Sequence, residues 1–68
     1  MNEEQFNMTM RKFLKKVGVT SQREIEHAIS AAMESGKLQG NETLKASVVL
    51  EIPEIGLRQE IEGGISLE

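Results

Sequence analysis

A chain of 68 residues is long enough for one small domain, which would bury only about 60% of the surface that the unfolded chain exposes. It has no Cys and a single His, which excludes disulfides, thiolate zinc sites, cysteine nucleophiles and iron–sulfur clusters. The formal net charge of −3 argues against a chain built as a whole to bind nucleic acid.

The charge is unevenly distributed along the chain. The formal charge of residues 1–19 is +2, because this stretch contains two glutamates and four basic residues. The formal charge of residues 41–68 is −4, because this stretch contains six glutamates and only two basic residues, Lys45 and Arg58. The N-terminal residues carry the wrong charge for a signal peptide, and no strictly apolar run is longer than three residues, the length of Val48–Leu50. We therefore expect no membrane segment and a cytoplasmic location.

The first predicted element is an amphipathic helix over about residues 2–17. Its apolar residues recur at helical spacing, as expected for one stripe on a helix surface. The stripe consists of Phe6, Met10, Phe13, Leu14 and Val17. Gly18 follows, and a glycine directly after the last residue of such a stripe predicts a left-handed helix stop.

A second helix is predicted over about residues 21–35. Ser21 and Glu24 have the spacing of a capping box, in which the hydroxyl and the carboxylate satisfy orphan N–H groups at a helix start. Its apolar stripe is Ile25, Ala28, Ile29, Ala32 and Met33, and Gly36 is expected to end it in the left-handed conformation. The short connection after Gly18 predicts that the two helices form a hairpin or a bent pair.

The spacing then changes from helical to strict alternation, which predicts strands over about residues 44–52 and 57–67. Pro53–Gly56 has the composition of a four-residue hairpin loop, with Gly56 in the left-handed conformation. Placing Ile52 opposite Leu57 puts the apolar residues of both strands on one face. It also puts Glu51 opposite Arg58 on the other face. The pair Gly63-Gly64 predicts a bulge or bend.

The predicted fold is a single α+β domain over residues 1–68 of order α-α-β-β, in which a two-helix hairpin packs on a C-terminal antiparallel β-hairpin. The apolar faces of these elements would form its core: Phe6, Met10, Phe13, Leu14, Val17, Ile25, Ile29, Met33, Leu44, Val48, Leu50, Ile52, Leu57, Ile61 and Ile65.

Few residues suggest chemistry. The cluster Arg11, Lys12, Lys15 and Lys16 is a candidate anion site, although cations also suit the last turn of a helix that ends at residue 17. His27 lies opposite the apolar stripe of its helix, where a solvated side chain is more plausible than a catalytic base. No metal-ligand or phosphate-loop spacing is present. We expect no enzyme activity, no cofactor and no metal.

The open edges of the β-hairpin are the most suggestive feature for function. A two-stranded ribbon is marginal on its own, and no third strand is predicted that could pair with either edge. Val49 on the outer face, Ile55 in the loop and Met8 among the basic residues are candidate contact residues. The favoured hypothesis is a protein-interaction or homodimerising module that uses the hairpin edge, with a second copy or another protein as its partner.

The alternative hypothesis is a winged helix-turn-helix protein that binds nucleic acid, since two short helices and a hairpin follow one another. The second helix region counts against it, because Arg23 in the helix and Lys37 just after it are outnumbered by three glutamates. Nucleic acid is therefore the less favoured partner.

The stretch from Phe6 to Glu26, which includes Arg11-Lys12-Phe13-Leu14-Lys15-Lys16-Val17-Gly18-Val19-Thr20-Ser21, resembles a family of very short bacterial proteins classed as a domain of unknown function. The resemblance continues through Gly40-Asn41-Glu42-Thr43-Leu44 into the hairpin. It implies a cytosolic stand-alone bacterial module, and it implies no activity, cofactor or catalytic residue.

Overall fold

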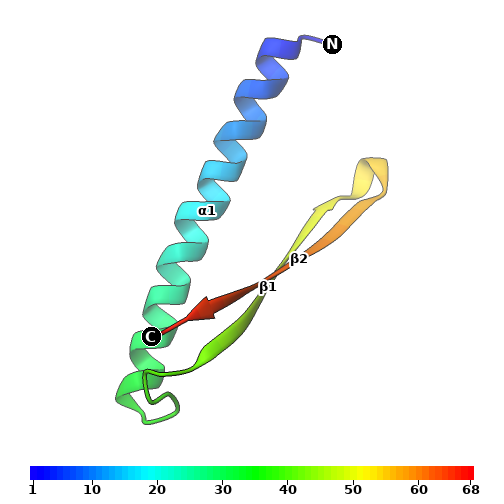
Figure 1. The fold of residues 1–68 in the computed structure, drawn as a ribbon. Helices are drawn as coiled ribbons and strands as arrows, with labels where there is room; N and C mark the ends of the chain where they lie inside the picture. The colour runs from blue at the N-terminus through cyan, green and yellow to red at the C-terminus, as the bar shows by residue number, and fades with distance from the viewer. The chain divides into compact units, whose positions relative to one another are not determined.

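The computed structural model describes residues 1–68. It contains one long helix, α1 (Glu3–Glu34), followed by strand β1 (Thr43–Ile52), the short 3-10 turn η1 (Pro53–Ile55) and strand β2 (Leu57–Ser66) (Figure 1). The chain divides into two compact units, Met1–Lys37 and Leu38–Glu68, which are described separately below.

Both ends of α1 are capped by local interactions. The side-chain oxygen of Asn2 accepts a hydrogen bond from the backbone N–H of Gln5 at 3.0 Å, and two glutamates occupy the first turn. At the other end Gly36 has φ +80°, and the N–H of Lys37 donates to the carbonyl of Ala32 at 2.9 Å. This is a Schellman motif, so the predicted role of Gly36 is confirmed.

The predicted two-helix hairpin is wrong, because α1 runs without a break through Gly18 and Ser21. Gly18 does not have a positive φ, so it is part of the helix and does not stop it. Continuing the helix preserves backbone hydrogen bonds that a turn would leave to water or to caps, since each new helix end exposes four unpaired groups. The order of elements is therefore α-β-β.

The two apolar stripes merge into one on the continuous helix. Val17 and Ile25 are eight residues apart, which at about 100° per residue leaves them only about 80° apart around the helix. Ser21 lies between them, and all three are half-buried along with Ile29 and Ala32. The stripe thus extends along α1, which at about 1.5 Å per residue is about 48 Å long.

The continuous helix also removes the geometric basis of the alternative hypothesis. A helix-turn-helix needs a turn between its two helices, and residues 18–21 are helical here. The predicted capping box at Ser21 and Glu24 falls in the interior of α1, where it caps nothing. Nucleic-acid binding itself is not tested by this geometry.

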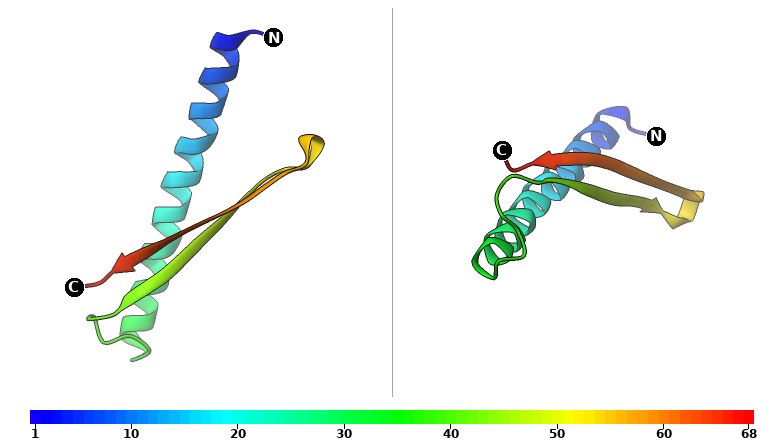
Figure 2. Two further views of the ribbon diagram at one scale, coloured as in Figure 1. Left: turned by 45° about the vertical axis from the view of Figure 1, so that its right-hand side comes forward. Right: turned by 60° about the horizontal axis from the view of Figure 1, so that its bottom comes forward.

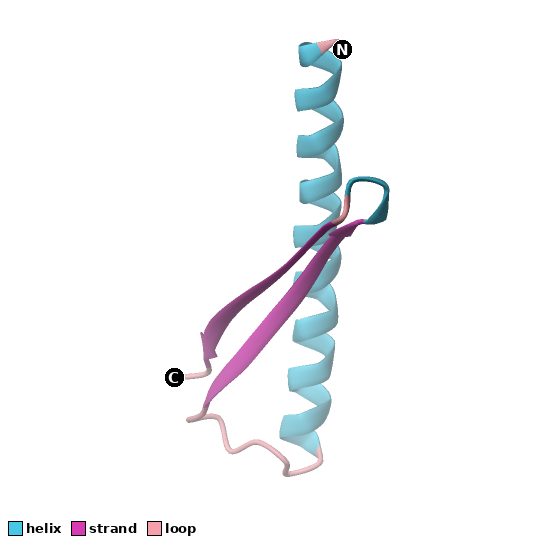
Figure 3. Ribbon diagram, turned by 90° about the vertical axis from the view of Figure 1, so that its right-hand side faces the viewer, coloured by secondary structure: helices cyan, strands magenta, loops and turns pink.

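The β-hairpin agrees closely with the predicted one. β1 and β2 are antiparallel, and their ten pairs run from Thr43↔Ser66 to Ile52↔Leu57. Gly56 closes the loop with φ +68° after η1, and its N–H donates to the carbonyl of Pro53 at 3.1 Å. The two strands twist about each other along their length (Figure 2), and the 3-10 turn stands out at the tip of the hairpin (Figure 3).

The predicted bulge at Gly63-Gly64 is wrong. Gly63 pairs with Ala46 and Gly64 with Lys45 in an uninterrupted register. The ladder continues one pair beyond the strands, since the N–H of Leu67 donates to the carbonyl of Glu42 at 2.9 Å. Neither glycine has a positive φ, so both have a backbone conformation that residues other than glycine can also adopt.

No side chain in the structure is buried, so neither unit has a core of its own. The apolar faces were identified correctly as faces, but each remains at least partly accessible. Phe13 on α1 is 51% exposed, and Ile61 on β2 is 54% exposed. A single helix and a two-stranded ribbon each have one apolar face and no second layer of their own to cover it.

Candidate functional site

The two free edges of the hairpin are the most extensive candidate site. The sheet contains only β1 and β2, so each strand has a neighbour on one side alone. Each strand is ten residues long, which is longer than most strands in globular proteins. Backbone N–H and C=O groups along both edges are therefore available to another strand.

The two faces of the hairpin differ in character. The face that contains Val48 and Ile61 is apolar, and the opposite face is polar except for Val49, which is 43% exposed and pairs with Glu60. Glu51 lies opposite Arg58 as predicted. The ion pair on this face, however, joins Lys45 Nζ to a carboxylate oxygen of Glu62 at 3.4 Å.

The three predicted contact residues lie in different places. Val49 is in the middle of β1, and Ile55 is in η1 at the tip of the hairpin, where it is 72% exposed. Met8 belongs to α1, is 62% exposed, and lines a shallow surface depression with Glu4, Asn7 and Arg11. Only Val49 is thus part of a hairpin edge.

The predicted basic cluster is exposed on α1, over residues 11–16. The explanation that cations suit a helix end is wrong here, because α1 continues to Glu34 and its last turn has no basic residue. Like charges four residues apart, as at Arg11 and Lys15, oppose each other by a few tenths of a kcal/mol. Favourable charge at a helix end therefore does not explain why these four basic residues lie together on the surface of α1.

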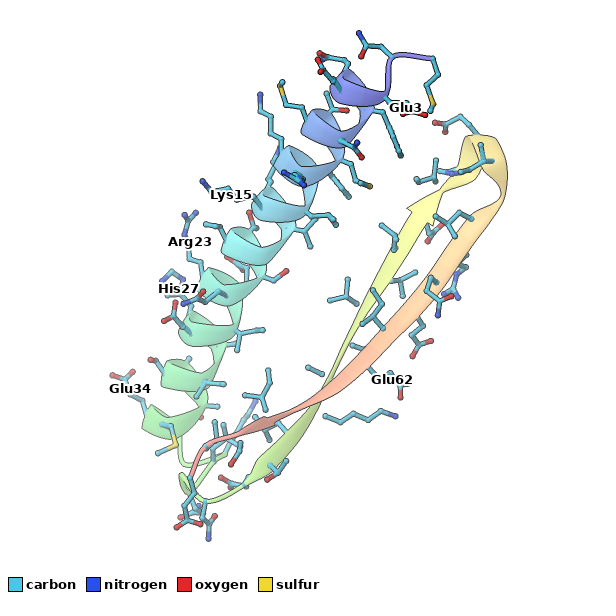
Figure 4. The ribbon with its side chains drawn as sticks, turned by 45° about the horizontal axis from the view of Figure 1, so that its top comes forward. Glu3, Lys15, Arg23, His27, Glu34 and Glu62 are labelled. Atoms are coloured by element: carbon cyan, nitrogen blue, oxygen red, sulfur yellow. The ribbon has the colours of Figure 1, made fainter.

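His27 shares the charged side of α1. Figure 4 shows Lys15, Arg23, His27 and Glu34 projecting from one side of the helix. The His27 side chain is exposed. The structure contains no group of three or more His or Glu side chains arranged to hold a metal ion. It also contains no helix with the length and apolar character needed to cross a bilayer.

Sequence reasoning missed the role of Glu42 in the connection between α1 and β1. Its carboxylate accepts hydrogen bonds from the N–H of Gln39 at 2.8 Å and from the N–H of Gly40 at 3.0 Å. The hydrogen bond from the N–H of Gln39 is the largest cause of the lowered pKa of Glu42; desolvation, the next largest effect, raises that pKa, and hydrogen bonds from the backbone of Gly40, Glu42 and Asn41 lower it further. The sequence signal that could have indicated this role was a glutamate, Glu42, two residues after Gly40 in a polar loop.

The model of a family of unknown function, DUF6494, matches residues 1–68 of the chain. No curated protein and no solved structure gave a match.

Proposed function

We propose a function for this chain, which belongs to the family of unknown function DUF6494. It is a non-enzymatic interaction module that self-associates through an edge of its β-hairpin. The partner is a second copy of this chain, which adds its strand to the sheet. The composition supports a non-enzymatic role, since the chain has no Cys and only one His.

The observation that carries this proposal is the pair of long free edges of β1 and β2. An isolated two-stranded ribbon is marginal in water, and at least three strands, or packing against a helix, are needed for independent stability. Strand addition satisfies the backbone groups of an edge, and it contributes affinity through main-chain hydrogen bonds.

The exposed apolar face of the hairpin supports the same conclusion. Val48 is 43% exposed and Ile61 is 54% exposed, although they form a cross-strand pair in the middle of the sheet. A second hairpin joined edge to edge widens this face without changing its character. Such a wider apolar face is what a sheet needs in order to form one side of a core.

Sedimentation of the full chain over a wide concentration range tests the proposal. The expected result is a mass that rises from 7.6 kDa toward twice that value. Because the chain has no Trp or Tyr, its concentration is followed by refractive index or peptide absorbance. A mass that stays monomeric at the highest concentration contradicts the proposal, and so does a mass increase only after another protein is added.

Two proline variants make the test specific to the edges. Val49 and Glu60 are paired in the hairpin, and, as shown below, both direct their N–H groups away from it. Val49→Pro or Glu60→Pro therefore removes one edge donor and leaves the internal ladder in place. We expect one of the two variants to abolish self-association while circular dichroism still reports the hairpin. If both variants dimerise normally, neither edge of the hairpin is the contact.

A further inference from the structure

The alternation of the ladder identifies which backbone groups face outward. The N–H of Leu67 donates to the carbonyl of Glu42, so this pair belongs to the hydrogen-bonded class. Hydrogen-bonded and non-hydrogen-bonded pairs alternate along an antiparallel ladder. All pairs of the hairpin share one register, so the even-numbered residues of β1 bond inward and its odd-numbered residues direct N–H and C=O outward. On β2 the even-numbered residues direct these groups outward.

The side chains of these outward-directed residues all lie on the polar face, and the two edges differ in charge. On β1 they are Thr43, Lys45, Ser47, Val49 and Glu51, and on β2 they are Arg58, Glu60, Glu62, Gly64 and Ser66. The β1 edge therefore has one cation and one anion. The β2 edge has two anions and one cation.

Self-pairing of β2 brings like charges together. A twofold antiparallel contact must place outward-directed residues opposite each other, and only two such registers align nine residues of β2 with a second β2. One places Glu60 opposite Glu62 of the second copy, and the other places the two copies of Glu62 opposite each other. Like charges directly opposite each other in a sheet are destabilising.

Self-pairing of β1 allows a complementary arrangement. Of its two nine-residue registers, one places Lys45 opposite Val49 of the second copy. The other places Lys45 opposite Glu51 of the second copy, twice by symmetry, with Val48 of both copies at the twofold axis. Opposite charges in directly facing positions stabilise a strand pair, so this register is favoured.

We infer that two copies join through their β1 edges in this register and form a four-stranded antiparallel sheet of order β2-β1-β1-β2. The inference deepens the proposed function and rests on it. The row of side chains across the polar face then reads Gly64, Lys45, Glu51 and Arg58, with the last two from the second copy. Every charged residue in this row has an opposite charge beside it.

The apolar face supports the same register. The central row becomes Ile61, Val48, Val48 and Ile61, since Val48 and Ile61 are already paired within each hairpin. A twofold axis perpendicular to the sheet keeps the apolar faces of both copies on one side. The outer edges that remain are the two β2 edges. Their glutamates protect them from further pairing, so the assembly closes as a dimer.

A single cysteine tests the register, because the chain has none of its own. The two copies of Val48 form a non-hydrogen-bonded pair, with Cα atoms about 4.5 Å apart, within the range of a disulfide. Val48→Cys should therefore give a covalent dimer on mild oxidation. The matched control is Ile61→Cys in the same row, whose copies are three strand spacings or about 14 Å apart and should stay uncoupled.

Charge reversal tests the same register without a disulfide at the twofold axis. Lys45→Glu places glutamates opposite each other in its own dimer, and Glu51→Lys does the same with lysines. Each variant alone should dimerise roughly tenfold more weakly than the unmodified chain. An equimolar mixture should recover dimerisation as a heterodimer, because both contacts then join opposite charges. Mixing does not change any destabilisation within an individual hairpin, so recovery reports the contact between the two copies.

The outcomes separate this inference from the proposed function. If the unmodified chain dimerises but Val48→Cys does not cross-link and the mixture shows no recovery, the register is wrong while edge pairing survives. Loss of the dimer in Glu60→Pro rather than Val49→Pro assigns the contact to β2 and also overturns the inference. A chain that is monomeric at every concentration removes the proposed function itself.

Discussion

Replacing Gly18 with alanine is the most direct test of the continuous helix, because the two possible backbone conformations predict opposite signs. Gly18 is inside α1 and does not have a positive φ. A Cβ built on it meets no atom within 4 Å, so no steric cost offsets the change. Glycine in a helix interior is less stable than alanine by about 0.5–1 kcal/mol. Gly18→Ala should stabilise α1 by about this amount.

A left-handed turn at this position predicts the reverse. Alanine in the left-handed region costs roughly 1–2 kcal/mol, so the two alternatives differ by about 2 kcal/mol. Gly36→Ala is the matched control, because Gly36 has φ +80° and lies at the C-terminal cap of the same helix. We expect Gly36→Ala to destabilise the protein.

Thermal unfolding followed by far-ultraviolet circular dichroism measures both variants. A gain of about 1 kcal/mol corresponds to an increase of roughly 4–8 °C in Tm for a domain of this size. All samples are compared at one protein concentration, since self-association also raises Tm. A fall in Tm for Gly18→Ala, similar to that for Gly36→Ala, would refute the helical assignment.

Further predictions concern the exposed stripe, the loop and the caps. Phe13→Ala should leave a folded protein and cost below about 1 kcal/mol by denaturant unfolding, because Phe13 is half exposed and alanine is the better helix former; a loss of the whole fold contradicts the exposed stripe. The pKa of Glu42 is lowered in the folded state, so its contribution to stability is present above the unfolded pKa and is lost as pH falls through the folded pKa; an NMR titration should show it ionising at lower pH than a free glutamate. Asn2→Ala should cost about 1 kcal/mol through the lost N-cap, and unchanged helicity would argue against the cap. Gly56→Ala should cost roughly 1–2 kcal/mol because φ is +68°, whereas Gly63→Ala, with open space at the Cβ, should be close to neutral by the same measurement.

The hairpin was predictable because its information is local. The alternation from Leu44 to Ile52 assigns the faces, and a shift of one residue would reverse every side chain, so the register is strongly specified. Pro53 and Gly56 supply the loop chemistry that closes the two strands at Ile52 and Leu57. The predicted bulge failed because glycine is permitted in a regular strand as well as in a bulge.

The helical region was predicted less well because its local signals are ambiguous. Gly18 and the Ser21-to-Glu24 spacing are typical of a helix boundary, but both are also allowed inside a helix at modest cost. The phase of the two stripes was the signal that favoured continuity, since Val17 and Ile25 fall on the same side of a single helix. The position of the candidate edge was predictable, whereas the difference in charge between the two edges depends on the outward residues of the ladder.

The amino-acid sequence alone determined the two β-strands, their pairing, the separation of apolar and polar faces, and the cap at Gly36. Each depends on residues close together in the chain, where alternation, turn chemistry and capping act directly. Only the three-dimensional structure decided whether the chain turns back at Gly18. A turn there is favoured only when packing between the two halves offsets the lost helical hydrogen bonds, and that balance depends on contacts between residues far apart in sequence.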